Sequence, residues 1–468
     1  MQFSLGAYLR LLTFWALSSQ SLSFKCKHAP VYQGNSFITR HLTSRKKAVM
    51  GQSIIFETKR TDLAANTKQT DEQTELDKSS SLLDKIDVLF QIYFRKAFQN
   101  DAGRKDREFR LFTGLPLKPY NERETIRTEL VPGRVWGFEQ EQGFFNVSVN
   151  TRMTAIKLES GGLWVHAPVA PTIECMELLN SLGPVEHIVL PTTALEHKIF
   201  VGPFSKNYPD AKVWVAPDQW SWPINLPLNF KVDGFLESDK TFPWSNEIEY
   251  ELFQPPILGL GPANEVAFFH KATKSLLLTD LLISIPKDPP AIIPDAALAE
   301  SSVEEGEEPP SVIDQEVRRT GWSKMALQIL FFGPANPNTF NVVSEIPLVA
   351  PVSRTLVLER IPDSVVDWIN RITKWDIQQV IPCHFSAPVK ANSQDIKDAY
   401  SFAYKLVEPS SEDIMSSTNE EQSPVNPFEQ FFKKLTGSGE NNVQRKLKDP
   451  IMFSEQDMER INSVRNQL

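Results

Sequence analysis

The sequence predicts an α/β fold in which short apolar strands alternate with amphipathic helices. Hydrophobic residues make up 41% of the 468 positions, enough for a sizeable core. From residue 135 onward, two hairpin patterns and several buried-type strands are separated by segments with helical spacing. Polar side chains directly follow several of these strands, which is where open α/β folds place their functional sites. After the first thirty residues no run of about 20 apolar residues occurs, which excludes a polytopic membrane protein.

Residues 1–60 are predicted to be a presequence that is removed from the protein. Residues 5–19 are apolar with a single arginine, as in the core of a signal peptide. Residues 25–60 are basic, rich in Ser and Thr, and contain one acid, Glu57, as in a transit peptide. This order resembles the two-part presequences of algae with secondary plastids, with cleavage expected before Phe24. The sequence therefore predicts delivery to a plastid; the alternative is a buried N-terminal helix with a disordered basic arm.

The net charge of −9 is divided unevenly along the chain. Residues 1–60 hold nine of the 49 basic side chains and one of the 58 acidic ones, so the remainder carries −17. A body this acidic repels phosphate backbones, which argues against nucleic-acid binding. The chain also has no Gly-rich phosphate loop, dinucleotide fingerprint, CxxC or GxSxG motif. Its three cysteines suffice neither for a disulfide scaffold nor for a four-thiolate zinc site.

Residues 61–134 are predicted to connect the presequence to the main domain. Residues 61–80 are polar and acid-rich, as expected of a linker. Residues 81–98 place Leu, Ile, Phe and Tyr at helical spacing, which indicates an amphipathic helix packed on the main body. The alternative is a helix at a membrane surface, giving peripheral membrane contact without a transmembrane segment.

The main domain is expected over residues 135–407. Its predicted elements in chain order are strands 153–158 and 163–166 joined at Gly161-Gly162, helix 172–182 with Thr172 as N-cap and Gly183 as stop, strand 186–190, helix 195–207, strand 212–216, the hairpin 266–269 with 275–279, helix 363–373, strand 378–384 and helix 392–407. Residues 284–316 are rich in Pro and Glu and are predicted to be an insertion that cannot pack. Residues 408–468 are predicted to be a mostly disordered tail.

Five polar residues at the ends of predicted strands form the candidate site: His166, Glu196, His197, Asp280 and His384. The three histidines supply nitrogens and the two acids oxygens, enough for one metal ion if they converge. We predict His166, His197, Asp280 and His384 as metal ligands, and Glu196 and Asp280 as catalytic groups. Structural roles remain open for four of them: backbone bonding for His166, capping or ion pairing for Glu196 and His197, and turn formation for Asp280.

Three further polar residues are assigned to structure. Cys383 is predicted to be a small apolar filler rather than a ligand or reactive thiol. His187 and His270 are predicted to serve the fold. The segment Gln219-Trp220-Ser221-Trp222-Pro223 is predicted to pack within a loop, and an aromatic wall facing a ligand is the alternative.

These positions resemble the metal motifs of the metallo-β-lactamase superfamily. Its first motif, His-x-His-x-Asp-His, matches residues 192–197 (TTALEH), where Thr192 and Ala194 stand at the first two ligand positions. Residues 275–280 resemble the segment that ends in a metal-bridging Asp, and 381–384 the segment that ends in the last His. No histidine lies near 259–262, where another ligand belongs. The resemblance implies a four-layer αββα sandwich with a depleted metal motif.

The chain resembles more closely an uncharacterised family of cyanobacteria, algae and plants with this fold. The stretches that carry this resemblance are 152–154 (RMT), 163–168 (LWVHAP), 196–204 (EHKIFVGPF), 219–223 (QWSWP) and 381–385 (IPCHF). This family brings no known activity.

Two functions therefore stay open. The first is a plastid hydrolase of unknown substrate with one zinc or iron ion, in which the metal generates a nucleophile from water. The second is a non-catalytic scaffold or binding protein of the plastid that has lost the metal. The surviving acids and histidines favour the first, and the absent ligands at Thr192 and Ala194 favour the second. The partner is an unidentified small molecule or protein.

Overall fold

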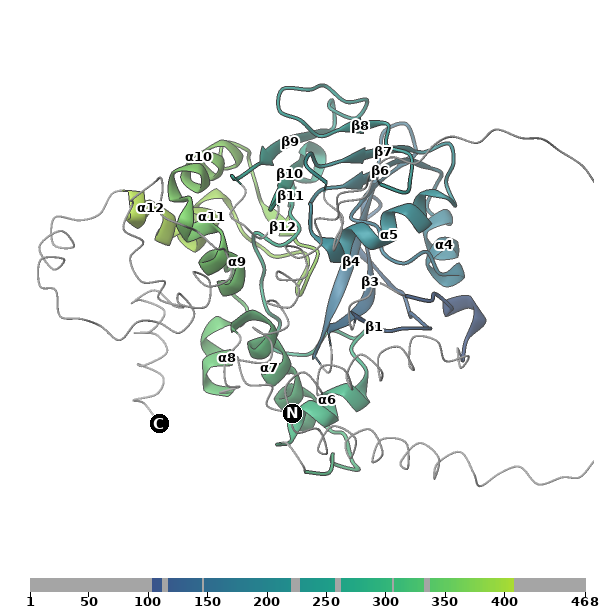
Figure 1. Ribbon diagram of the computed structural model, residues 1–468, viewed down its shortest axis with the longest axis vertical. Coiled ribbons are helices and arrows are strands. Elements are labelled where there is room, and N and C mark those ends of the chain that lie inside the picture. Colours follow the sequence, from purple (N-terminus) through teal and green to yellow (C-terminus); the bar gives the residue numbers. More distant parts are fainter. Residues whose placement is uncertain are drawn as a thin grey trace, which may run out of the picture. The chain divides into compact units, whose positions relative to one another are not determined.

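The computed structural model describes residues 103–111, 117–144, 147–219, 228–256, 262–304, 307–331 and 337–407 (Figure 1). The predicted presequence, linker, amphipathic helix 81–98 and C-terminal tail lie outside the described residues, so these assignments stay predictions. Within the described part, no helix is long and apolar enough to span a membrane.

The first sheet is mixed, and its strands follow the order β1-β3-β4-β5-β6-β7-β8, with β2 also paired to β3. Pairing is antiparallel from β1 to β5 and parallel from β5 to β8. Its strands are β1 (Leu117–Lys118), β2 (Ile126–Val131), β3 (Val135–Phe144), β4 (Val147–Lys157), β5 (Leu163–His166), β6 (Val185–Leu190), β7 (Lys212–Val215) and β8 (Gly234–Phe235). The predicted hairpin is confirmed, because β4 pairs with β5 from Thr154–His166 to Lys157–Leu163.

The second sheet has the order β12-β11-β10-β9. Its strands are β9 (Ile248–Phe253), β10 (Glu265–His270), β11 (Ser275–Leu277) and β12 (Gln379–Ile381). The hairpin of β10 and β11 was expected, and β12 joins β11 in parallel although about 100 residues separate them. The ends of β11 and β12 therefore lie side by side, which brings Asp280 and His384 to the same edge of the sheet.

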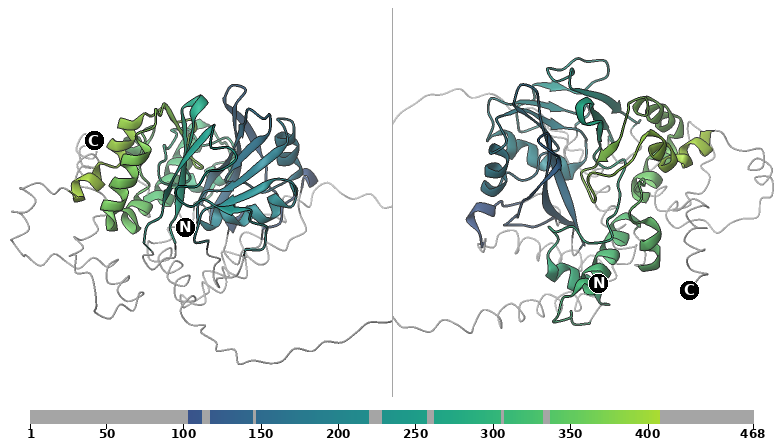
Figure 2. Two further views of the ribbon diagram at one scale, coloured as in Figure 1. Left: turned by 90° about the horizontal axis from the view of Figure 1, so that it is seen from above. Right: turned by 180° about the vertical axis from the view of Figure 1, so that it is seen from behind.

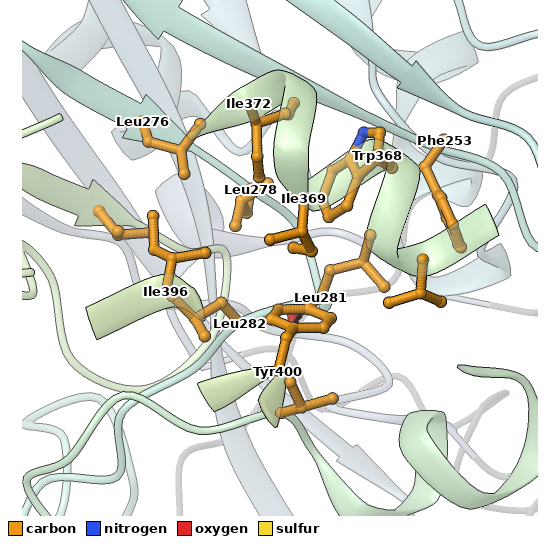
Figure 3. Packing of buried hydrophobic residues seen from close by; sticks show 14 of the residues in the cluster. Phe253, Leu276, Leu278, Leu281, Leu282, Trp368, Ile369, Ile372, Ile396 and Tyr400 are labelled. Carbon is orange, nitrogen blue, oxygen red and sulfur yellow. Dashed lines mark hydrogen bonds between the residues drawn. The ribbon is translucent and has the colours of Figure 1, made fainter. Parts of the chain in front are cut away.

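Helices cover the outer face of each sheet. Helices α4 (Ile173–Asn180) and α5 (Leu195–Ser205) pack through Leu179 and Phe204 on the first sheet. Thr172 caps α4 as predicted, its hydroxyl accepting from the Cys175 N–H at 3.1 Å. Helices α10 (Pro362–Ile372), α11 (Ser393–Ala399) and α12 (Ser401–Val407) cover the second sheet, with Trp368 and Tyr400 in their shared core (Figure 3).

The inner faces of the two sheets meet in a third core. Trp164 of β5 is its centre, with ring centroids 4.9 Å from Phe268 and 5.6 Å from Trp244. The order of layers is therefore helices, sheet, sheet, helices, with the two sheets face to face (Figure 2). The predicted four-layer αββα architecture is confirmed.

The prediction that residues 284–316 cannot pack is wrong. Ile285, Ile293 and Leu298 are buried in a core shared with Trp322. The segment includes α6 (Asp295–Ser302), which packs against α7 (Gln315–Phe331) so closely that a Cβ on Gly321 would lie 1.9 Å from the Leu298 carbonyl oxygen. Acidic composition suggested a loop, but the acids and prolines flank the apolar residues that pack.

Several other elements were not anticipated. Strands β1 and β2 lie before the expected domain start at 135 and pair with β3, so the sheet begins at Leu117. The helix expected over 392–407 is divided at Tyr400, whose hydroxyl donates to the Leu281 carbonyl. The remaining helices are α8 (Pro337–Val343), α9 (Pro351–Leu356) and the 3-10 turns η1 (Lys105–Arg107), η2 (Lys271–Thr273) and η3 (Leu358–Arg360).

Candidate metal centre

Three of the predicted site residues converge. His197 lies in the first turn of α5, Asp280 three residues after β11, and His384 three residues after β12. Each offers one ligand atom, and these atoms all lie within 4.8 Å of one another. Two atoms bound to one ion at roughly 2.0–2.1 Å are at most about 4.2 Å apart, so this group needs only a small contraction to hold a metal.

The imidazole of His384 is oriented by the backbone of β4. Its Nδ1 lies 2.8 Å from the Asn150 carbonyl oxygen. Because a carbonyl only accepts, we assign the proton to Nδ1, which leaves a lone pair on Nε2 of the neutral ring. Nε2 faces Asp280 Oδ1 at 3.2 Å. A lone pair opposite a carboxylate oxygen needs a cation between them, either a second proton or a metal ion. Metal-binding histidines commonly show this bond from the far ring nitrogen.

His197 presents a second nitrogen to the same carboxylate. The side chain is 1% exposed, and Nε2 lies 3.6 Å from Asp280 Oδ2, too far for a hydrogen bond. This nitrogen has no hydrogen-bond partner among the described residues. Burial lowers the pKa of His197, but the carboxylates of Asp280, Glu196 and Glu265 outweigh burial and leave that pKa raised.

Asp280 is held as an anion at the centre of the group. Burial raises the pKa of its carboxyl, but the facing imidazoles of His197 and His384 favour the charged form more strongly. The net pKa of Asp280 lies well below its usual range. An ionised oxygen donor therefore stands between two nitrogen donors, which suits a divalent transition metal.

Glu265 supports Asp280 and was not among the predicted residues. It is the first residue of β10 and 4% exposed, and its Oε1 accepts from the Thr279 N–H at 2.7 Å. Oε2 accepts from the Asp280 N–H at 3.1 Å. Burial, followed by the nearby charge of Asp280, raises the pKa of Glu265. The sequence carried one signal, an acid followed by four apolar residues in the same strand.

His166 lies beside the converging group but is not one of its three members. Its ring stacks on Trp164, and Nδ1 lies 3.7 Å from Cys383 Sγ. Burial, aided by the charge of His197, lowers the pKa of His166 to about 3, so this ring is neutral. Burial also raises the pKa of the Cys383 thiol well above its ordinary value, in keeping with the predicted apolar filler.

The remaining predicted positions have local roles. Glu196 is partly buried in the first turn of α5, and its charge raises the pKa of His197. The Thr192 hydroxyl accepts from the Ala194 N–H at 3.1 Å, so the stretch without ligands forms the turn into α5. Gln219 donates to the Thr192 carbonyl at 2.9 Å, whereas residues 220–223 and 257–261 lie outside the described part.

The two histidines assigned to structure lie in other contacts. His187 Nδ1 accepts from the Trp214 indole N–H at 3.2 Å. His270 Nδ1 lies 2.8 Å from the Thr273 hydroxyl. Neither belongs to the group of His197, Asp280 and His384.

The four layers, in the order helices, sheet, sheet, helices, define an α/β protein of the metallo-β-lactamase-like class. Its candidate metal site consists of His197, Asp280 and His384. Residues 132–347 and 336–402 match the family model described as domain of unknown function DUF4336. The match spans more than half of the sequence, and the chain belongs to this family. No curated protein matches the sequence.

Solved structures with a similar arrangement are distant in sequence. The metal-soaked Flv1 flavodiiron core from Synechocystis sp. PCC6803 is 10% identical, with 60% of this chain and 62% of that core covered at a TM-score of 0.37. The metallo-β-lactamase from Pontibacter korlensis is 11% identical, with 60% and 99% covered at a TM-score of 0.33. This chain therefore spans about three fifths of the flavodiiron core. Such remote likeness carries no information on activity.

Proposed function

We propose that this protein is a hydrolase with one zinc or iron ion bound by His197, Asp280 and His384. The observation that carries the proposal is that both Nε2 atoms face the Asp280 carboxylate, at 3.2 Å for His384 and 3.6 Å for His197, and that Nε2 of the buried His197 has no hydrogen-bond partner among the described residues. Two imidazoles and one carboxylate are a known set for a catalytic zinc, which keeps an open position, and for non-haem Fe(II).

The chemistry divides between the ion and the chain. A zinc or iron ion bound there would supply a Lewis acid that polarises the scissile bond and acidifies a water molecule. Asp280 contributes the negative charge of the site, and Glu265 fixes its backbone. Glu196 is the proposed general base, because its charge already acts on His197 from the first turn of α5. The substrate is not specified by these residues.

A non-catalytic scaffold or binding protein is the second candidate. The observation in its favour is that a second proton on the His384 ring, placed on Nε2, also accounts for its 3.2 Å contact to Asp280 without a metal ion. Thr192 and Ala194 supply no ligand and form a turn instead. In this case the three residues are an ion-paired cluster that stabilises the edge of the second sheet.

Metal content separates the two candidates. The full chain, His384→Ala and the control His187→Gln are purified without chelators, and bound metal is measured by mass spectrometry. We expect about one equivalent of zinc or iron in the parent and control, and its loss in His384→Ala, which removes one of three ligands. Absence of metal from all three, with a melting temperature unchanged by added zinc or iron(II), excludes the hydrolase.

The cellular location is proposed separately. Residues 1–60 pair an apolar signal-like core with a basic stretch that has a single acid, and this composition supports plastid delivery. A fusion of these residues to a fluorescent protein, expressed in an alga with secondary plastids, is expected to enter the plastid. A cytosolic fusion contradicts this location.

A further inference from the structure

The loop that carries His384 is bonded to strand β4 along its whole length. The carbonyl of Cys383 accepts from the Arg152 N–H at 2.7 Å. An isolated bridge pairs His384 with Thr151. The Asn150 carbonyl accepts from His384 Nδ1 at 2.8 Å. Three consecutive residues of β4 therefore bind the loop from Pro382 to Phe385, and one of these bonds orients the ring of His384.

The Asn150 side chain bonds both backbone groups of the residue after His384. Its Oδ1 accepts from the Phe385 N–H at 2.9 Å, and its Nδ2 donates to the Phe385 carbonyl at 3.0 Å. Asn150 is fully buried, so no water competes for these groups. Nδ2 also lies 3.2 Å from Glu139 Oε1, which fixes which end of the amide carries the nitrogen.

Arg152 holds the same loop from a second direction. Its guanidinium donates to the carbonyls of Pro382 and Phe385 and pairs with the Glu139 carboxylate. Arg152 is 2% exposed, so its charge depends on Glu139 for compensation. Glu139 and Arg152 lie directly opposite each other in the β3–β4 pair, which makes this anchor a rigid part of the sheet.

The anchored loop holds a conformation that its sequence does not favour. Phe385 has φ +61°, in the left-handed region that costs a residue with a Cβ roughly 1–2 kcal/mol. Such a conformation persists only where its surroundings impose it. The two hydrogen bonds from the Asn150 side chain act on Phe385 itself, the residue that follows His384.

We propose that Asn150 is a positioning residue for His384. Its carbonyl fixes the Nδ1–H tautomer, and its side chain fixes the backbone at Phe385, so that Nε2 faces Asp280 before any ion binds. This inference rests on the proposed metal site for its purpose, but the orientation of the ring is a property of the chain alone.

A second buried amide provides a matched control. Gln140 of β3 is fully buried, accepts from the Ala170 N–H at 3.0 Å and donates to the Ala170 carbonyl at 2.8 Å. Like Asn150, it bonds both backbone groups of one residue. The loop of Ala170, however, contains none of the three residues His197, Asp280 and His384. Loss of either amide removes the same number of buried bonds to a loop, and only the loss at Asn150 is expected to disturb His384.

The test compares Asn150→Ala with Gln140→Ala in the full chain, and Asn150→Ser replaces the first variant if it does not fold. Zinc affinity is measured by competition with a chromophoric chelator. The ring nitrogens of His384 are observed by ¹⁵N NMR in the metal-free protein. The sample is kept at a pH about two units above 6.5, the pKa of an ordinary histidine. The His384 signals are assigned by their loss in His384→Ala.

We expect the dissociation constant for zinc to rise about 10- to 100-fold in Asn150→Ala, as for other groups that orient a ligand. In Gln140→Ala it should change by no more than about threefold, because the side chains of Gln140 and Asn150 share no hydrogen-bond partner. The parent should show one His384 tautomer with the proton on Nδ1. Asn150→Ala keeps the main-chain carbonyl but removes the side-chain bonds that hold Phe385, so the ring should leave that carbonyl part of the time and show a mixture of both tautomers. Equal loss of zinc affinity in both variants, or an unchanged tautomer in Asn150→Ala, overturns the proposal. If the parent binds no zinc, the hydrolase proposal fails and the NMR comparison alone decides the role of Asn150.

Discussion

His384 Nε2 lies 3.2 Å from Asp280 Oδ1, and the proton of that ring is placed on the opposite nitrogen by the Asn150 carbonyl. Asp280 is therefore the residue on which metal binding should depend most. Asp280→Asn keeps the shape of the side chain and removes its charge. In the parent, zinc at 100 times its dissociation constant should add about 2.7 kcal/mol to the free energy of unfolding. We expect Asp280→Asn to lose most of this gain in urea titrations with and without zinc.

A control for that experiment is Asp288→Asn. Asp288 is an exposed carboxylate paired with Arg319 at 2.6 Å, outside the metal group. Its substitution removes one charge of the same kind and should leave the zinc response intact. A full zinc response in Asp280→Asn would mean that the ion binds elsewhere on the chain.

The contact between α6 and α7 gives a second prediction. Gly321 meets the Leu298 carbonyl so closely that an added Cβ would lie 1.9 Å from the oxygen. Gly321→Ala should therefore push the two helices apart and cost about 1–3 kcal/mol, as overpacking does in other cores. Equilibrium unfolding in urea measures this loss, with Glu316→Ala on the exposed face of α7 as control. In a free helix the same change gains about 1 kcal/mol, so a stabilised variant would show that the helices do not touch.

Trp164 gives a third prediction because it fills the core between the two sheets. It is fully buried and lies against Phe268 and Trp244. Trp164→Leu should leave a cavity and lower the free energy of unfolding by about 3 kcal/mol. Trp375→Leu, at a partly buried ring stacked on Phe269, should cost less. Equal losses in the two variants would contradict the central place of Trp164.

The predictable parts of the fold are those whose signals are local. Thr172 predicts the start of α4, because an N-cap bonds a residue only three positions further on. The apolar residues that end at Leu190 predict β6, because a short apolar run is visible in the local sequence. Strand β3 was missed since Gln140 and Gln142 interrupt its apolar pattern. Both are nevertheless buried. The amide of Gln140 bonds the Ala170 backbone, and Oε1 of Gln142 accepts from Arg123, partners that lie 30 and 19 residues away in the chain.

The site was predictable to a similar degree. His197, Asp280 and His384 were expected from their places after strands or at a helix start. The groups that orient them were not, because Asn150 acts on His384 and Phe385 across more than 230 residues. Glu265 acts through backbone N–H groups of Thr279 and Asp280, and no spacing rule in one sequence reveals such contacts.

Acid should destabilise the protein through its buried histidines, and His270 provides the clearest case. Burial, aided by the charge of Arg134, lowers the pKa of His270 to about 4, whereas an unfolded chain takes up this proton near pH 6.5. Between these pH values the unfolded state binds more protons than the folded state, so the free energy of unfolding falls as the pH falls. At about 1.4 kcal/mol per pH unit, the loss from this residue approaches 3 kcal/mol at pH 4.

His270→Gln isolates that contribution. Glutamine retains a polar contact to Thr273, which lies 2.8 Å from the ring nitrogen, but takes up no proton. Urea titrations of parent and variant at intervals from pH 7 to pH 4 should show a smaller acid-induced loss in the variant. Part of the loss should remain, because burial lowers the pKa of His166 and of His187 in the same direction. Parallel pH profiles for the two proteins would show that His270 is protonated equally in the folded and unfolded chains, contrary to its complete burial at the end of β10.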